Sequence, residues 1–396
     1  MTTSLRMPRT GLFLWILRVV SRGSDMWRLS DELLEEFERT LEESYSKVVS
    51  IARSIRQRWK MLPEPESCTI CGVDGSRGVE RLSGLVFYII SAASVGGDIR
   101  EMHEVTTLRP HIHIDERIRL HMHTSEYRLG SIADEDIVLI DGSLRGAIIR
   151  PPAYLTKDVY SALSKLYDLE GVVEDFIEVL DRWYEEITDD VKKGVARKNY
   201  LLTRSEYFDR IERGCRKGEQ NDRDNLMILM EYIEYLHALD RLLERNVVFV
   251  AKSFYTSEFT ANLSVTDSAV LDYLAREQFG EEKAGFIQFK PVLQKSLPWF
   301  SKNFENLNSE IYGAFVRFAD GGNIYMLEST EPIEEEMIAK LCNCEADGYL
   351  IPLIHAHRHA EIKRRELKTI VSAMLSATDP KYSFLLKRGR DVLEGF

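Results

Sequence analysis

The sequence has no apolar run long enough to cross a membrane. Its one membrane-like stretch, residues 11–20, spans ten residues and is interrupted by Arg18, whereas a spanning helix needs about 20. Arg6 and Arg9 precede it, which leaves a signal peptide open, although no clear small-residue cleavage site follows. A second interpretation is that residues 1–25 are a leader that is untranslated or disordered, with translation starting at Met26. We predict a cytoplasmic protein with no membrane partner.

The sequence also lacks an excess of positive charge and an even set of cysteines. The formal net charge of −12 argues against a basic nucleic-acid-binding coat, but it allows a local cationic groove and supplies carboxylates for metal binding. Five cysteines, an odd number, indicate reduced thiols rather than a disulfide framework. Cys68, Cys71, Cys342 and Cys344 could together hold zinc. We favour buried free thiols, because Cys71 falls in a predicted core strand and Cys-x-Cys is an uncommon zinc spacing.

Internal repeats and low-complexity tracts are absent, and the hydrophobic content of 44% is typical of a globular protein. Periodicity predicts an N-terminal helix within 26–62, strands within 63–155, only helices over 156–246, and further strands over 247–396. We therefore predict an α/β fold with a mixed central sheet and flanking helices, interrupted by a helical insertion at 156–246. The last segment includes an expected strand at residues 348–354 and a helix from about His357.

Two stretches combine an apolar run with Asp-Gly-Ser. The aspartate of "GVDGSRG" is Asp74 and that of "IVLIDGSL" is Asp141. An apolar run that meets turn residues indicates a buried strand ending at the aspartate. Asp-Gly is common in turns, so either aspartate alone could be structural. Two carboxylates at one sheet edge would repel each other, and a divalent cation relieves that repulsion, which favours a metal site.

A third carboxylate is expected from the helix predicted between these strands. Its apolar face includes Ile118, Met122 and Leu129, and Glu126 lies at the border of that face, where it can reach a neighbouring strand end. Glu116 points nearly opposite and is the alternative ligand. A partly exposed glutamate without a function is the competing interpretation.

Imidazoles and cations extend the candidate site. His355, His357 and His359 would share one face of an extended segment, which suggests zinc. A single histidine beside carboxylate-bound metal would instead act as an acid–base group or contact phosphate. Lys252, directly after a predicted strand, and Arg145, just beyond the second Asp-Gly-Ser, are candidate phosphate-binding residues. For each of these residues a packed or solvated side chain is the alternative.

A basic and aromatic stretch, residues 191–217, occurs within this acidic chain. It includes Lys192, Lys193, Arg197 and Lys198 together with tyrosines and a phenylalanine, a mixture suited to backbone contact and base stacking on nucleic acid. A solvated helical face explains it equally well. We expect the insertion to contribute to DNA guidance or dimerisation, not to catalysis.

Together these motifs resemble those of the NurA nuclease family. The resemblance rests on "GVDGSRG", "SEYRLG" on a helix, "IVLIDGSL" and "GYLIPLIHAHRHA", which occur in this order between about residues 70 and 370. It implies an RNase H-like core, manganese-dependent 5′-to-3′ exonuclease activity on single- and double-stranded DNA, and single-strand endonuclease activity. It also implies a homodimer and a partnership with HerA, a hexameric DNA-translocating ATPase, in the resection of double-strand breaks.

The resemblance also implies roles for individual residues. Asp74 and Asp141 match the family's metal-binding aspartates, Glu126 matches the glutamate between them, and Tyr349 and His357 match a C-terminal tyrosine and histidine. The carboxylates would hold Mn²⁺, or alternatively Mg²⁺, in a two-metal site for phosphodiester hydrolysis. His357 would shuttle a proton or contact phosphate, and Tyr349 would orient either.

Two other classes of protein compete with this interpretation. Actin-like ATPases and sugar kinases also place an Asp-x-Gly-Ser/Thr turn after a first strand, and they need an adenosine-binding glycine pair later in the chain. Gly321 and Gly322 are the candidate pair, but they also fit a hairpin turn. A non-catalytic DNA-binding module is the third class, and it would leave the paired aspartates unexplained.

Overall fold

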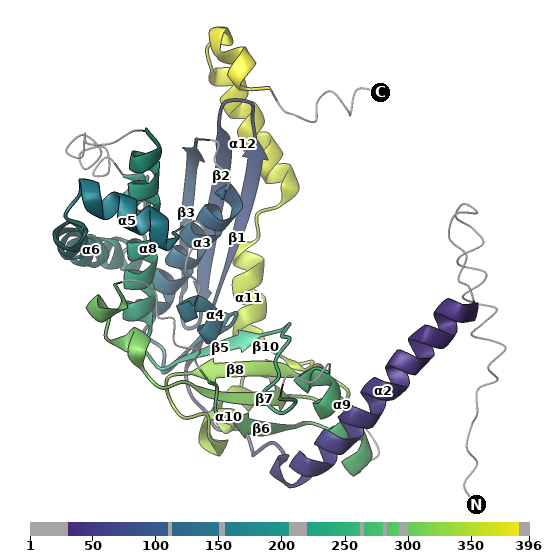
Figure 1. Ribbon diagram of the computed structural model, residues 1–396. Coiled ribbons are helices and arrows are strands. Elements are labelled where there is room, and N and C mark those ends of the chain that lie inside the picture. The colour runs from purple at the N-terminus through teal and green to yellow at the C-terminus, as the bar shows by residue number, and fades with distance from the viewer. Residues whose placement is uncertain are drawn as a thin grey trace, which may run out of the picture.

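The protein contains a central eight-stranded mixed sheet. The computed structural model describes residues 31–109, 113–149, 155–205, 220–261, 265–279, 283–292 and 300–387. The strand order is β3-β2-β1-β4-β5-β8-β7-β6 (Figure 1). The strands are β1 (Ile70–Arg81), β2 (Val86–Val95), β3 (Ile99–Leu108), β4 (Ile137–Asp141), β5 (Val247–Ala251), β6 (Gly285–Phe289), β7 (Tyr312–Arg317) and β8 (Tyr325–Ser329). The predicted α/β class and mixed central sheet are confirmed. The predicted leader, with Met26 and the apolar run at 11–20, lies outside the described residues.

The two halves of the sheet differ in strand length. Strands β1, β2 and β3 form a long antiparallel meander, whereas β4 and β5 are five residues each and run parallel to β1. Every residue of β2 is buried, while β3, at the edge, alternates mainly between exposed and buried residues. The long meander therefore extends beyond the short strands (Figure 1), and β1 continues past the end of β4.

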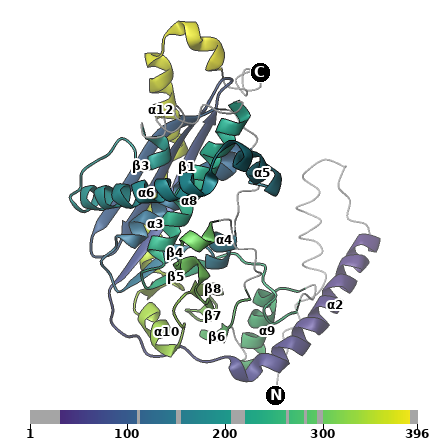
Figure 2. The same cartoon turned by 60° about the vertical axis from the view of Figure 1, so that its left-hand side comes forward.

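Helices cover one face of the sheet in two layers. Helix α3 (Ile114–Ser131) packs on the sheet, and α8 (Gln220–Leu242) packs on α3. Helices α5 (Lys157–Leu166) and α6 (Leu169–Lys192) contact α8 in turn, as Figure 2 shows from a second side. The described residues between 155 and 246 contain no strand. The division of the chain into two core parts and an insertion stays a prediction.

The opposite face carries α10 (Glu335–Cys342), α11 (Ile351–Ala360) and α12 (Arg364–Ala377). The predicted strand at residues 348–354 is wrong. Only β10 (Tyr349–Leu350) is extended, and it pairs with β9 (Glu345–Ala346) before α11 begins. Buried Leu353, Ala356 and Ala360 recur at three- and four-residue spacing, which is a helical period, and proline is tolerated in a first turn. The three nearby histidines therefore lie on a helix.

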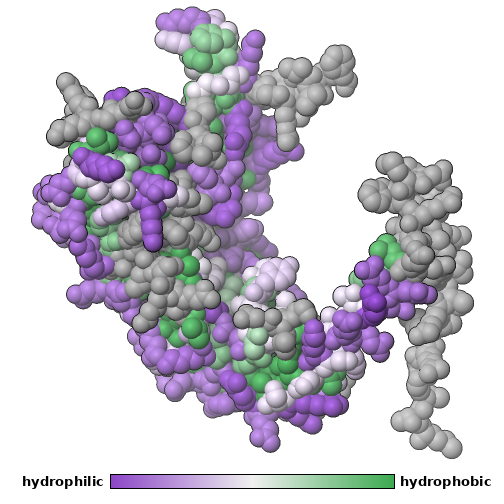
Figure 3. Space-filling view, viewed as in Figure 1, coloured by the Kyte–Doolittle hydropathy of each residue, from purple (hydrophilic) through white to green (hydrophobic). Residues whose placement is uncertain are grey.

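The N-terminal helix α2 (Asp31–Ile55) projects from the body of the molecule (Figures 1 and 3). Near its end Ala52 and Ile55 are buried in a cluster with Val270 and Leu274 of α9 (Asp267–Phe279). A helix is therefore present within the predicted range of 26–62, over Asp31–Ile55, while the domain boundaries stay a prediction. None of the described helices is long and apolar enough to cross a membrane.

Candidate active site

The candidate site lies where β4 ends beside the longer β1. The parallel pairing of β1 with β4 covers Ile70–Val73 and 137–140, so Asp74 is the first β1 residue beyond it. Asp74 was expected at a strand end, but β1 continues to Arg81 and pairs Asp74 with Ala93 of β2. The expected strand end at Asp74 is therefore wrong. Asp74 lies beside an opening because the neighbouring strand β4 ends there, not because β1 ends. Asp141 is the last residue of β4.

Glu126 approaches this opening from α3. A Cβ added to Gly75 would lie 2.3 Å from Oε1 of Glu126, so only glycine allows the carboxylate to come this close to β1. Glu126 is 3% exposed, whereas Glu116, the alternative ligand, is exposed. Burial raises the pKa of Asp74, and the negative charges of Glu126 and Asp141 raise it further. The structure therefore brings three mutually repelling carboxylates together.

Each carboxylate has an imidazole or ammonium partner. His357 Nδ1 lies 2.7 Å from Asp74 Oδ2, Lys252 Nζ donates to Asp141 Oδ2 at 2.6 Å, and His123 Nδ1 lies 2.6 Å from Glu126 Oε2. Gly75 N–H also donates to Asp74 Oδ1 at 2.8 Å. Lys252 therefore neutralises part of the acidic charge, as the two histidines would when protonated.

The donor set suits a hard divalent cation, although the described side chains do not already form a set of metal ligands. Across the described residues, no group of three or more His, Cys, Asp or Glu side chains could hold a metal ion as it stands. One oxygen of each carboxylate is instead paired with His123, His357 or Lys252. Carboxylate oxygens are the ligands that Mn²⁺ and Mg²⁺ prefer, and cation binding would relieve the repulsion that raises the pKa of Asp74. Asp74, Glu126 and Asp141 therefore have the chemistry that a divalent cation needs, once their oxygens turn from these partners to the ion.

Tyr349 contributes a buried hydroxyl near this site. Its Oη has no hydrogen-bond partner among the described residues. Burial raises the pKa of Tyr349, and the negative charge of Asp141 adds to the rise. A protonated hydroxyl left without a partner beside carboxylates is a donor that a bound ligand could satisfy.

Arg145 occupies a different environment from the one expected for a phosphate ligand. Its guanidinium pairs with Glu328 and Glu258, and its side chain is 15% exposed. Ser143 Oγ donates to Glu328 Oε2 at 2.7 Å, and Glu328 is fully buried. These contacts clamp the turn after Asp141, so a phosphate would have to compete with two ion pairs. Phosphate binding by Arg145 stays a prediction.

Other predicted residues lie outside the site. Cations of the basic stretch pair with acids of this chain, namely Lys192 with Asp134, Lys193 with Asp189 and Arg197 with Asp190. Residues 206–217 lie outside the described residues. His359 lies 3.0 Å from Glu101, and His355 is exposed, because residues two apart on a helix diverge. No zinc group therefore forms among these histidines.

The cysteines and the glycine pair lie in ordinary structural surroundings. Cys68, Cys71, Cys342 and Cys344 form no disulfide, and of these four only Cys71 is fully buried, which raises its pKa to about 12. That these thiols bind no zinc stays a prediction. Gly321 has a φ of +74° and lies with Gly322 between β7 and β8. The pair thus forms a hairpin turn, as its alternative interpretation predicted.

The sequence did not lead us to place His123 or Glu328 at the site; His123 was weighed only with His121 as a zinc ligand. His123 lies three residues before Glu126 on α3, a spacing that places two helical side chains next to each other. This signal was present in the sequence. Glu328 offered no such signal, because it comes from β8 and meets the turn after Asp141 only through the strand order.

Known proteins resemble this chain over most of its length. The NurA domain model matches residues 68–362. The DNA double-strand break repair nuclease NurA of Pyrococcus furiosus is 30% identical over 459 aligned residues, which cover 96% of this chain and 100% of that protein. A crystal structure of NurA bound to dAMP and manganese superposes with a TM-score of 0.76 at 27% identity, covering 91% of this chain and 100% of that one. The NurA nuclease from Sulfolobus solfataricus, 18% identical, shares the fold with a TM-score of 0.57 over 94% of this chain and 97% of its own.

Fold and site define an α/β protein with a carboxylate-rich centre at an internal strand end. With a family match over most of its length and a relative at 30% identity, the chain belongs to the NurA family.

Proposed function

We propose that this protein is a metal-dependent DNA nuclease. The observation that carries the proposal is the convergence of Asp74, Glu126 and Asp141 beside the end of β4. Further support comes from a relative named as a double-strand break repair nuclease and a related structure that holds dAMP and manganese. Metal-assisted hydrolysis of a phosphodiester needs carboxylates gathered in this way.

The test is cleavage of end-labelled single-stranded and duplex DNA with Mn²⁺, with Mg²⁺ and with a chelator. We expect cleavage with Mn²⁺ or Mg²⁺ and none with the chelator. DNA binding without cleavage under every metal condition would instead favour a non-catalytic module. Tight MgATP binding would favour the ATPase alternative.

We infer that Asp74, Glu126 and Asp141 hold the metal, Mn²⁺ or alternatively Mg²⁺, as a two-metal site. When bound, such ions polarise the phosphate and lower the pKa of water. Lys252, 43% exposed and paired with Asp141, would turn to the phosphate of the bound strand. His357, 62% exposed and held at Asp74, would accept or donate a proton at Nε2. Tyr349 would donate its unpaired hydroxyl to a phosphate oxygen.

Our proposal includes 5′-to-3′ exonuclease activity on single- and double-stranded DNA, single-strand endonuclease activity, and action in DNA end resection. It also includes a HerA-type hexameric ATPase as partner. The name of the Pyrococcus furiosus relative supports the repair role. Digestion of 5′-blocked and 3′-blocked duplexes tests the polarity, since only a 5′ block should protect. Co-purification with the HerA-type ATPase from the same source tests the partnership.

We also propose a homodimer in which α2 contributes to the interface. Phe37, Leu41 and Tyr45 repeat every four residues and are 60%, 51% and 58% exposed. The same helix buries its later apolar residues against α9. Apolar side chains spaced this way form one stripe, and such stripes on projecting helices are typical of interfaces. A second copy would bury this stripe.

Light scattering after size exclusion tests the dimer. Wild type should have twice the mass of one chain, and Phe37→Glu with Leu41→Glu should shift it toward one chain mass because charge would be buried at the interface. Glu36→Gln, an exposed substitution on the same helix, should leave the dimer intact. A wild-type monomer at micromolar concentration would contradict the proposal.

The remaining assignments follow from these proposals. An RNase H-like core is supported by an antiparallel β1–β2–β3 meander followed by two strands parallel to β1. We keep the division into a core of 63–155 and 247–396 with a helical insertion of 156–246. A cytoplasmic location is proposed because a repair nuclease needs access to chromosomal DNA.

A further inference from the structure

A cluster of imidazoles around one carboxylate lies between the edge strand β3 and α11. Glu101 and His103 are two residues apart on β3, so their side chains lie on the same face of the sheet. His359 of α11 meets them there. Its Nδ1 lies 3.0 Å from Glu101 Oε1, and His103 Nε2 lies 3.3 Å from Glu101 Oε2. Two imidazoles therefore contact the two oxygens of one carboxylate.

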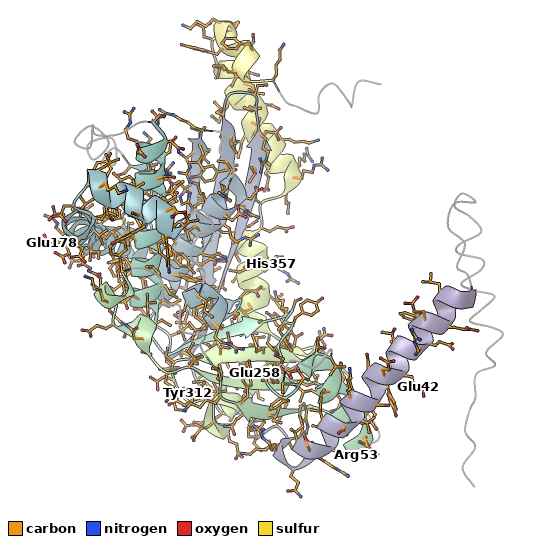
Figure 4. The ribbon with its side chains drawn as sticks, viewed as in Figure 1. Glu42, Arg53, Glu178, Glu258, Tyr312 and His357 are labelled. Carbon is orange, nitrogen blue, oxygen red and sulfur yellow. The ribbon has the colours of Figure 1, made fainter. Side chains whose placement is uncertain are left out.

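This cluster is separate from the candidate metal centre. Asp74 and Glu101 both pair with Ala93 of β2, so one strand lies between them and their backbones are about 10 Å apart. Because residues two apart on a helix diverge, His359 points away from His357 and its partner Asp74. Figure 4 labels His357 on α11. An ion at each of the two places would have ligands of its own.

The helical conformation of α11 adds a fourth side chain to the cluster. His355 lies four residues before His359, so the two imidazoles lie on one face of the helix. His355 is exposed, and within the described part of the chain it has no hydrogen bond or ion pair. Two histidines at this spacing on a helix are the zinc-binding pair of metalloprotease motifs. The zinc grouping expected of an extended segment with His357 does not form, but the helix brings a different pair together.

The distances within the cluster suit a tetrahedral zinc ion. Zinc binds imidazole nitrogen and carboxylate oxygen at about 2.0–2.2 Å, which separates two ligand atoms of a tetrahedron by about 3.4 Å. The two nitrogen–oxygen distances at Glu101, 3.0 and 3.3 Å, are close to this separation. Among the described residues these side chains do not form a ready set of ligands, because they bind one another. Glu101, His103 and His359 are 38%, 52% and 39% exposed, so they can turn to an ion that enters from solvent.

The chemistry of the cluster favours zinc over the ions expected at the carboxylates beside β4. Burial alone would raise the pKa of Glu101, but its hydrogen bonds with His359 and His103 outweigh burial and lower it. The carboxylate is therefore ionised at neutral pH, as a ligand has to be. Imidazole is a good ligand for zinc, whereas Mg²⁺ and Mn²⁺ prefer oxygen. Three imidazoles with one carboxylate make a zinc-type donor set.

We propose that Glu101, His103, His355 and His359 bind one zinc ion. Helix α11 packs mainly on β1 and β2, and β3 is the edge strand, paired with β2. An ion held by both elements would tie the helix to the edge of the sheet. The site is structural and does not depend on the proposed nuclease function.

The first experiment is a titration of the full chain with Co²⁺ and then Zn²⁺ in a saturating excess of Mg²⁺. Mg²⁺ takes oxygen ligands and leaves imidazoles free. We expect one equivalent of Co²⁺ with the intense visible absorption of tetrahedral coordination, displaced by one equivalent of Zn²⁺. Asp141→Asn should bind the same equivalent. An absence of zinc binding in wild type would overturn the proposal, and its loss in Asp141→Asn would place the ion at the carboxylates beside β4.

Substitutions of single histidines assign the ligands. Loss of a residue that only supports a metal ligand already costs about 10–100-fold in affinity, so His103→Ala and His359→Ala should each weaken zinc binding at least about tenfold. His113→Ala is the matched control, because it removes a partly buried imidazole before α3, on the other face of the sheet. Competition with a chromogenic chelator measures the affinities. Equal zinc affinity of His103→Ala and wild type would overturn the link to β3.

Amide hydrogen exchange gives a readout independent of ligand assignment. An ion that joins β3 to α11 binds the native state alone, so zinc should raise the melting temperature in excess Mg²⁺. It should also slow exchange in β3. His359→Ala should show neither effect, while its melting temperature without zinc stays close to that of wild type because the residue is exposed. Zinc binding that leaves exchange in β3 unchanged would show that the ion does not join the two elements.

Discussion

At the scale of the residue, the carboxylates beside the end of β4 have the largest expected effect on activity. Asp141→Asn keeps the shape of the side chain but removes its charge. Cleavage should fall by orders of magnitude, because bound metal contributes several kcal/mol to the transition state. Folding should change little, since Asp141 repels the nearby Asp74 and its ion pair with Lys252 is partly exposed to solvent.

Asp74→Asn should behave in the same way. The double variant should cleave DNA scarcely more slowly than either single variant, because residues that act as one unit lose their shared function with the first substitution. Cleavage rates with Mn²⁺, together with circular dichroism, measure both claims. Asp98→Asn, on an exposed carboxylate, is the control. Activity near wild type in the Asn variants would contradict the site, and unfolded variants would indicate that the aspartates are structural.

The buried carboxyl group of Glu104 predicts that the stability of the protein depends on pH. Burial raises its pKa to about 7, although Tyr200 N–H and Leu201 N–H both donate to it. A carboxyl whose pKa is raised by folding contributes stability that is complete below about pH 4.5 and lost as pH rises through about 7. Glu104→Gln should remove this dependence.

The difference in unfolding free energy between wild type and Glu104→Gln should therefore change between pH 5 and pH 8 by an amount on the order of 3 kcal/mol, at about 1.4 kcal/mol per pKa unit. Urea unfolding at both pH values measures it. Parallel pH profiles for the two proteins would show that Glu104 does not titrate in this range.

At the scale of the element, α3 is held between the sheet and α8 by buried ion pairs. Glu231 of α8 pairs with Arg117 of α3 at 2.7 Å and with Arg204 at 2.6 Å, and it is 1% exposed. Because α3 also carries Glu126, this interface determines where the third carboxylate lies. Burial alone would raise the pKa of Glu231, but the positive charges of Arg117 and Arg204 outweigh burial and lower it.

Glu231→Gln should destabilise the protein by about 3–5 kcal/mol, since two buried guanidinium groups would lose their counter-charge. Thermal or urea unfolding measures the loss. Glu178→Gln, on an exposed residue of α6 labelled in Figure 4, should change stability by less than about 0.5 kcal/mol. Equal stability of the two variants would mean that the α3–α8 ion pairs contribute nothing net.

At the scale of the whole molecule, metal binding should stabilise the fold. Asp74, Asp141 and Glu126 come from β1, β4 and α3, so an ion held by all three connects these elements in the native state alone. Saturating Mn²⁺ should raise the melting temperature, with about 2.7 kcal/mol gained at a concentration of 100 Kd. EDTA should reverse the shift, and Asp141→Asn should greatly reduce it. The same shift in Asp141→Asn would place the metal elsewhere.

Much of this arrangement follows from the sequence alone. Strand and helix periods depend on neighbours in the chain, so the runs that became β2, β4, β5 and α3 could be predicted from their patterns. Asp74 and Asp141 were identifiable because each follows an apolar run, and Glu126 because it borders the apolar face of its helix. The strand predicted at 348–354 failed because a short apolar run is compatible with both periods, and only packing on β1 decides between them.

Tertiary structure decided which residues meet. His357 pairs with Asp74 across 283 positions, Ser143 with Glu328 across 185, and Lys252 with Asp141 across 111. These contacts depend on the order and length of the strands, which local patterns do not encode. Because β4 is shorter than β1, Asp74 in the middle of β1 lies just beyond the end of β4, where Asp141 and Glu126 can approach it.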